Sequence, residues 1–127
     1  MDFAHLKGEF NGTMGTISTK NSNNNIVHLA TCIVAKETSD SYNYMIEHAM
    51  KFQAVRDFLN KPTTTIFTDK HRGSDSAIPT ALPLAEHLRC LEHMLKNHGN
   101  VGPEGRMHLY SAARAPDKQT CEYHLGK

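Results

Sequence analysis

The sequence predicts an α/β fold, in which an antiparallel three-stranded meander is followed by a helix, a fourth strand, a helix, a fifth strand and further helices. Three observations support this prediction. The first 35 residues are rich in β-branched side chains and are divided by turn-forming residues, a long segment with helical periodicity follows, and a β-branched segment comes directly after it. A strand entered from a helix is typical of α/β proteins.

The three strands of the meander are separated by two turn signals. The pair Asn11-Gly12 predicts a hairpin turn, because both residues tolerate the positive φ angles that such turns need. A second strand is predicted over 13–19, and the Asn-rich run 20–25 after it is predicted to be a loop. The third strand is predicted over 26–35, which is rich in Ile, Val and Thr.

A long amphipathic helix is predicted from about Asp40 to Leu59, with Ser39 as its N-cap. Lys61-Pro62 ends it. The prediction rests on apolar residues that recur at helical spacing: Tyr42, Met45, Ile46, Ala49, Phe52, Val55 and Leu59. Of these seven, the first four, Tyr42 to Ala49, are expected in the core.

The segment 63–68 predicts the fourth strand, and Asp69 follows at its carboxyl end. Functional groups of α/β sheets gather beyond the carboxyl ends of strands, so Asp69 is a candidate site residue. Further along, a turn and N-cap at 73–75 begin a short helix that ends near Leu82, and 86–90 predicts the fifth strand. Helices are predicted at 91–97, 107–115 and 117–125.

Composition excludes several classes of protein. The chain has 127 residues and a net charge of +1, so bulk charge does not indicate a nucleic acid or a membrane as partner. The longest apolar-leaning run, 26–35, is too short to cross a bilayer. Charged residues near the start argue against a signal peptide. Three scattered cysteines do not form a disulfide framework and favour a reducing compartment.

Five short segments resemble, in order, the catalytic domain of Mutator-like element (MULE) transposases. They are Asp-Phe-Ala-His-Leu-Lys-Gly at 2–8, Phe-Asn-Gly-Thr at 10–13, Thr-Asp-Lys-His-Arg-Gly at 68–73, His-Leu-Arg-Cys-Leu-Glu-His at 87–93 and Ala-Ala-Arg-Ala at 112–115. Each segment alone would be weak evidence, but several in the right order are specific. The resemblance covers most of the chain.

This resemblance implies a ribonuclease-H-like fold of the DDE superfamily, whose acidic triad binds two Mg²⁺ or Mn²⁺ ions. Asp2 and Asp69 match the first two acids. The third acid of the family, a Glu, follows a helical insertion, and the tail offers only Glu104 and Glu122. We therefore expect a partial transposase core over 1–98, the start of the insertion over 99–127, and truncation at both ends.

The function implied by the resemblance is metal-dependent DNA cleavage and strand transfer in DNA transposition and recombination. Two hard cations activate the attacking oxygen and stabilise the leaving one, and carboxylates supply their ligands. Because the third acid is missing, we expect no catalysis from this chain alone. The resemblance implies a nuclear location and DNA as the partner, both at the ends of the element and at the target. It is compatible with either a monomer or a homo-oligomer.

Lys70, His71 and Arg72 form a basic group beside Asp69. One interpretation is a solvated loop. The other is a contact with DNA phosphates next to the scissile bond, which positions the DNA without reading its sequence.

Cys90 and His93 are three residues apart and share one face of a helix, which is compatible with a zinc site completed by His87 and His98. The alternatives are a buried cysteine among surface histidines, or, by resemblance, residues that support the catalytic pocket. The second function hypothesis follows from these residues: a degenerate or domesticated, non-catalytic DNA-binding or interaction module, stabilised by zinc in its narrower form.

Overall fold

The structure is a computed structural model that describes residues 1–9, 11–97, 99 and 101–126. The chain folds into two compact units, Met1–Arg89 and Cys90–Lys127, and each is described by itself. The predicted α/β fold is confirmed, with an antiparallel three-stranded sheet, a parallel two-stranded sheet and helices.

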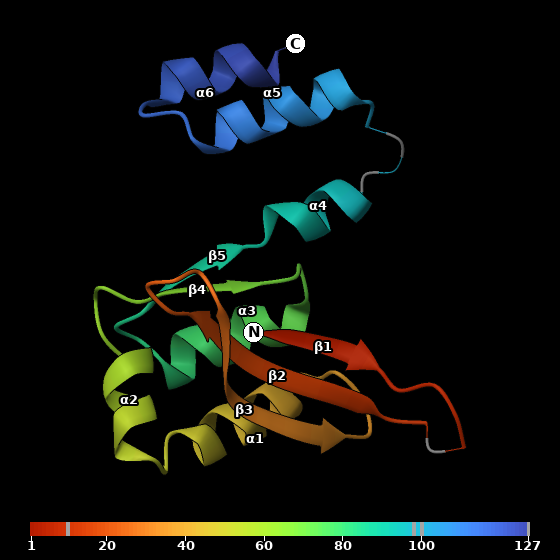
Figure 1. Cartoon of the computed structure of the whole chain (residues 1–127), viewed down its shortest axis with the longest axis vertical. Helices are drawn as coiled ribbons and strands as arrows, with labels where there is room; N and C mark the ends of the chain where they lie inside the picture. Colours follow the sequence, from red (N-terminus) through yellow and green to blue (C-terminus); the bar gives the residue numbers. More distant parts are fainter. Residues whose placement is uncertain (10, 98, 100, 127) are drawn as a thin grey trace. The chain divides into compact units, whose positions relative to one another are not determined.

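The three-stranded sheet of the first unit has the order β1-β2-β3, with β1 at Asp2–His5, β2 at Thr13–Lys20 and β3 at Ile26–Val34 (Figure 1). Both pairings are antiparallel, as the predicted meander requires. Thr13 pairs with His5, so Asn11-Gly12 ends a longer connection rather than forming the whole turn.

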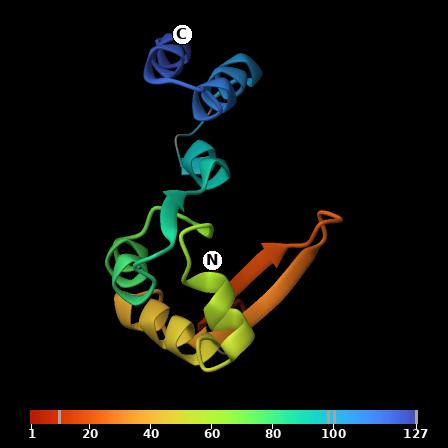
Figure 2. The same ribbon diagram turned by 90° about the vertical axis from the view of Figure 1, so that its left-hand side faces the viewer.

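The predicted Asn-rich loop joins β2 to β3. The side-chain oxygen of Asn21 accepts hydrogen bonds from the main-chain N–H groups of Asn23 at 3.0 Å and Asn25 at 2.9 Å. Asn24 has a φ of 63°, a left-handed conformation that Asn tolerates better than most residues. Figure 2 shows the hairpin projecting away from the helices of the first unit.

The single helix predicted over 40–59 is wrong, because two helices occupy this segment: α1 at Ser39–Ala49 and α2 at Gln53–Leu59. The N-cap of α1 is Thr38, whose hydroxyl accepts from the N–H of Ser41. Phe52 has an extended backbone and a side chain that is 69% exposed. The extended backbone at Phe52 therefore separates the two helices.

The core of the first unit lies between the sheet and α1. The four residues expected there are all buried, and they pack with Ile17 of β2: Tyr42, Met45, Ile46 and Ala49. α1 also packs against α3, which spans Arg72–Ala81. The apolar periodicity of the sequence thus identified the face of α1 that is removed from water.

The second sheet pairs β4 at Thr65–Thr68 with β5 at Glu86–Arg89 in parallel. The helix between these strands, α3, begins earlier than predicted because His71 is its N-cap, and Nδ1 of His71 accepts from the N–H of Gly73 at 3.1 Å. Pro79 lies inside α3 rather than in its first turn.

The second unit contains α4 at Leu91–Asn97, α5 at Pro103–Ala113 and α6 at Lys118–Leu125. α5 begins at Pro103, four residues before the predicted start at 107. Proline is favourable in the first turn of a helix, because the N–H groups there have no partner within the helix. Asp117 caps α6. Within the described residues, no helix combines the length and apolarity needed to cross a membrane.

Candidate active site

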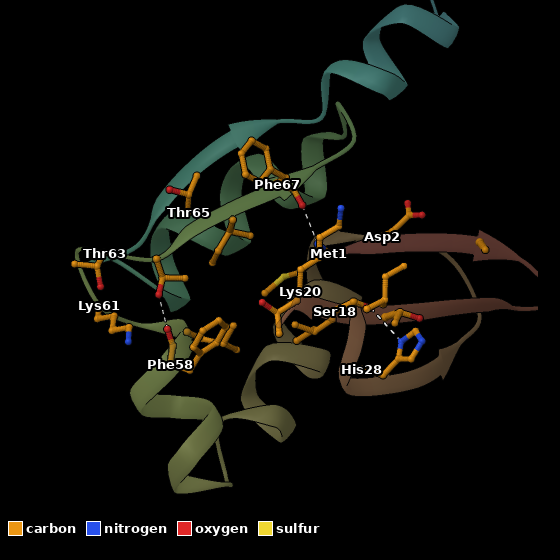
Figure 3. A pocket seen from close by; sticks show the side chains of 18 of the residues that line it. Met1, Asp2, Ser18, Lys20, His28, Phe58, Lys61, Thr63, Thr65 and Phe67 are labelled. Atoms are coloured by element: carbon orange, nitrogen blue, oxygen red, sulfur yellow. Dashed lines mark hydrogen bonds between the residues drawn. The ribbon is translucent and has the colours of Figure 1, made fainter. Parts of the chain in front are cut away.

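The start of β1 lies beside the end of β4. The amino nitrogen of Met1 donates a hydrogen bond to the main-chain oxygen of Phe67 at 2.8 Å (Figure 3). Asp2 follows Met1, and Asp69 comes two residues after Phe67. The fold therefore brings the two segments that carry the predicted acids to one junction between the sheets, although they are far apart in sequence.

Both aspartates accept a hydrogen bond from the next residue of the chain. Oδ1 of Asp2 accepts from the N–H of Phe3 at 2.9 Å, and Oδ1 of Asp69 accepts from the N–H of Lys70 at 2.6 Å. Asp2 is exposed and Asp69 is half-buried. Each of these bonds uses one carboxylate oxygen, so Oδ2 of each residue is left for a further ligand.

Beneath this junction, Thr68 fixes the end of β4. Its hydroxyl is buried, donates to Oγ of Ser74 at 3.3 Å and is hydrogen bonded to Nε2 of His87 at 2.8 Å. Burial, and then the positive charge of the chain's amino group, lower the pKa of His87. His87 belongs to the His-x-x-Cys-x-x-His segment, and here its ring ties β5 to the last residue of β4.

Arg89 fixes the main chain of Asp69 from the neighbouring strand. Its Nη1 donates to the main-chain oxygen of Asp69 at 3.0 Å and to Oγ of Ser74 at 3.4 Å, and its guanidinium pairs with Asp75. Arg89 is not among the site residues that the sequence predicts. No motif distinguishes it from an ordinary arginine in a strand, and only the parallel register of Thr68 with Arg89 brings it to this position.

The three predicted DNA-contacting residues differ in their surroundings. Lys70 and Arg72 are exposed. His71 is turned into the protein: besides capping α3, its ring stacks on Tyr42 with centroids 6.2 Å apart, and its Nδ1 lies 3.6 Å from Oε1 of Glu37. His71 thus fixes the start of α3, whose first residue is Arg72, and Lys70 directly precedes this cap.

A cavity of about 890 Å³ borders Asp2 (Figure 3). The three-stranded sheet, β4 and the end of α2 form its walls. Asp2 is the only predicted acid that lines it, since Asp69 does not. The larger apolar side chains of the wall are Met1, Met14, Ile17, Ile26, Phe58, Leu59, Ile66 and Phe67.

The predicted zinc ligands, except His87, and the two candidates for the third acid belong to the second unit. Cys90 is half-buried, and Nδ1 of His93 is buried and has no hydrogen-bond partner among the residues that the structure describes. The predicted fourth zinc ligand, His98, lies outside the described residues. Glu104 and Glu122 are both exposed. In the described part of the chain, no three or more His, Cys, Asp or Glu side chains are grouped so that they could hold a metal ion.

Comparison with known proteins identifies the family. A search of curated proteins and a search of solved structures each found no match. A family model described as the MULE transposase domain matches residues 1–97, which include both aspartates, the basic group and the Cys90–His93 pair. A ribonuclease-H-like assignment is consistent with this match and with the mixed α/β architecture. The chain belongs to the MULE transposase domain family.

Proposed function

We propose that the first unit carries two of the acids of a DDE-type transposase site, Asp2 and Asp69, and that the site acts in metal-dependent DNA cleavage and strand transfer. The observation that carries this proposal is the hydrogen bond between Met1 and Phe67, which joins the strand start bearing one acid to the strand end bearing the other. The family match supports a transposase-related function.

The donor set fits a hard divalent cation. Mg²⁺ is usually bound by one or two carboxylates together with substrate phosphates and water, and Asp2 and Asp69 each keep an oxygen for such a role. Bound Mg²⁺ would supply charge stabilisation at the phosphorus and an activated oxygen nucleophile. The residues of the chain would hold the acids in place, with Arg89 fixing the main chain of Asp69 and Thr68 fixing the end of β4.

We propose that Lys70 and Arg72 bind the phosphates of the DNA strand next to the acids. Both are exposed, and they flank His71, whose ring stacks on Tyr42 and whose Nδ1 caps α3. Phosphate contacts of this kind position DNA without selecting a sequence.

Metal binding tests the acid pair directly. Mn²⁺ added to isotope-labelled protein should broaden the amide signals of residues next to Asp2 and Asp69, and the variants Asp2→Asn and Asp69→Asn should each lose this broadening. The matched controls are Asp40→Asn and Asp57→Asn, which remove exposed acids of α1 and α2. Broadening that persists in both site variants would contradict the proposal.

Catalysis is tested with element-end DNA and Mg²⁺ or Mn²⁺. Because only two of the family's three acids are matched by residues of this chain, we expect no cleavage by the chain alone. Cleavage that Asp69→Ala abolishes would show that the chain is active by itself and would overturn this expectation.

DNA binding is tested separately. The double variant Lys70→Ala, Arg72→Ala should weaken DNA binding and give a shallower dependence on salt, because fewer counterions are released. The control, Lys51→Ala with Arg56→Ala, removes the same charges from the α1–α2 region. If the two double variants weakened DNA binding equally, a specific contact by Lys70 and Arg72 would be contradicted.

A second candidate function is a non-catalytic module stabilised by zinc through Cys90 and His93. The observation that favours it is the buried, unpartnered Nδ1 of His93, because a metal ion could satisfy such a nitrogen. Metal analysis of protein purified without added zinc tests it, with Cys90→Ser as the comparison. The absence of stoichiometric zinc would rule it out.

A further inference from the structure

The segment that leads into α1 lies directly against the start of α3. A Cβ atom at Gly73 would lie 2.8 Å from the main-chain nitrogen of Ser39 and 2.8 Å from the carbonyl carbon of Thr38, so the two main chains leave no room for a side chain between them. The helices that follow, α1 and α3, also pack together. Segments 36–39 and 70–73, which are far apart in sequence, therefore lie side by side.

The side chain of Glu37 connects these two segments. Its Oε1 accepts a hydrogen bond from the hydroxyl group of Tyr42 at 2.8 Å and lies 3.6 Å from Nδ1 of His71. The carboxylate is thus engaged with neighbouring side chains of the protein. The main-chain oxygen of the preceding residue, Lys36, accepts from Oγ of Ser41 at 2.6 Å, so the backbone of Lys36 is held as well. Lys36 itself is exposed.

Lys36 is therefore a neighbour of the basic group. It is next to Glu37, whose carboxylate approaches His71, the middle residue of that group. Lys36, Lys70 and Arg72 are all exposed. The two segments thus present exposed cations close to one another, although only the fold brings them together.

The same contacts connect Lys36 to the strand that carries Asp2. The ring of Tyr42, which is hydrogen bonded to the residue after Lys36, packs edge to face against the ring of Phe3, the residue after Asp2. Two carboxylates repel the phosphates of DNA, so cations around them favour its binding. The basic group follows Asp69 in the chain, and Lys36 adds a cation that is connected to the first acid.

We propose that Lys36 is a further phosphate-binding residue of this site, and that it contacts the DNA backbone together with Lys70 and Arg72. The inference rests on the proposed function, since it assumes that DNA is bound beside the two aspartates. A lysine binds phosphate as a point charge on a flexible stem, which suits a contact that positions DNA and reads no base. Because the backbone of Lys36 is held before DNA arrives, less freedom is lost on binding.

Fluorescence anisotropy of labelled element-end DNA with the full chain, at several salt concentrations, tests the proposal. Lys36→Met removes the charge and keeps most of the stem. It should weaken binding about three- to tenfold and reduce the slope of log K against log salt by about 0.9, the loss of one phosphate contact. Lys36→Arg keeps the charge and should bind as the wild type does. The matched control is Lys51→Met, which replaces an exposed lysine beyond the other end of α1 and should change neither value.

The double variant Lys70→Ala, Arg72→Ala separates this inference from the proposed function. If the double variant weakens binding and Lys36→Met does not, the inference is overturned and the proposed DNA contact stands. If neither weakens binding, or the wild type binds no DNA, both are overturned. Equal losses in Lys36→Met and Lys51→Met would also overturn the inference, because net charge alone would explain them. Circular dichroism checks folding, and Lys36→Ala replaces Lys36→Met if the methionine variant does not fold.

Discussion

The hydroxyl group of Tyr42 donates a hydrogen bond to Oε1 of Glu37 over 2.8 Å. Tyr42 is almost completely buried, and the ring of Phe3 meets its ring edge to face with centroids 4.6 Å apart. Burial raises the pKa of Tyr42 well above its usual value, and the bond and charge of Glu37 and the charge of Asp2 raise it further. The phenol is therefore held protonated at the centre of the first unit.

This raised pKa predicts a loss of stability in alkali. The folded state holds the phenol proton more tightly than the unfolded state, so the free energy of unfolding should fall as the pH rises above about 10. Tyr42→Phe should destabilise the protein by about 1 kcal/mol at neutral pH and flatten the alkaline decline. Urea unfolding at several pH values measures both effects. Tyr44→Phe, an exposed tyrosine of the same helix, should leave the alkaline decline unchanged.

Gly15 is required by the ring of Phe3. A Cβ atom at Gly15 would lie 2.5 Å from Cε1 of Phe3 and 3.0 Å from Sγ of Cys32. Gly15→Ala should therefore cost about 2 kcal/mol of stability, because the ring that packs on Tyr42 must move. Gly12→Ala is the control, since its Cβ would lie 3.4 Å from the nearest atom. Equal melting temperatures of the two variants would contradict the prediction.

Arg89 should stabilise the loop after β4. Arg89→Met removes the bonds to the main-chain oxygen of Asp69 and to Ser74, and it should cost about 1 to 2 kcal/mol. Hydrogen exchange at the amides of 69–71 should quicken in the variant. Arg72→Met, which removes an exposed arginine at the start of α3, should leave both measurements near wild type.

Asp117 should make the last helix sensitive to acid. Its carboxylate accepts from the N–H of Thr120 at 2.8 Å and from the Thr120 hydroxyl at 2.9 Å, and these bonds lower its pKa. The stabilisation is present above the usual pKa of aspartate and is lost as the pH falls through the lowered folded value. NMR chemical shifts of α6 should report fraying in acid. Asp117→Asn should remove this pH dependence while keeping one acceptor for the cap.

The sequence predicted the parts of the fold that depend on local pattern. The order of the strands, the turn at Asn21–Asn25 and the buried face of α1 follow from β-branched runs, turn chemistry and periodicity. The break between α1 and α2 could not be predicted in this way. Phe52 sits at helical spacing with Ala49 and Val55 and is nevertheless 69% exposed, so its place in the apolar pattern does not reflect burial.

The position of Asp69 after a predicted strand made it a candidate site residue, but Asp2 and the pairing of the two acids were predicted only through the resemblance. Motifs identified Asp2 and Asp69, but nothing local shows that their strands meet, since the contact joins residues 66 positions apart. The supporting role of Arg89 depends on the register of β4 with β5 and has no sequence signal. The role of His71 as the cap of α3 was not predicted either: histidine is not a common N-cap, and α3 begins before the predicted turn and N-cap at 73–75.

The junction between Met1 and Phe67 also has a kinetic consequence. The hairpin of β2 and β3 closes over a few asparagines, whereas this junction must close a loop that includes most of the first unit. The entropy lost in closing a loop grows with its length, and distant contacts tend to form late in folding. We therefore expect the hairpin and helices to assemble first during refolding, and the segments that carry the two aspartates to come together only in the final step.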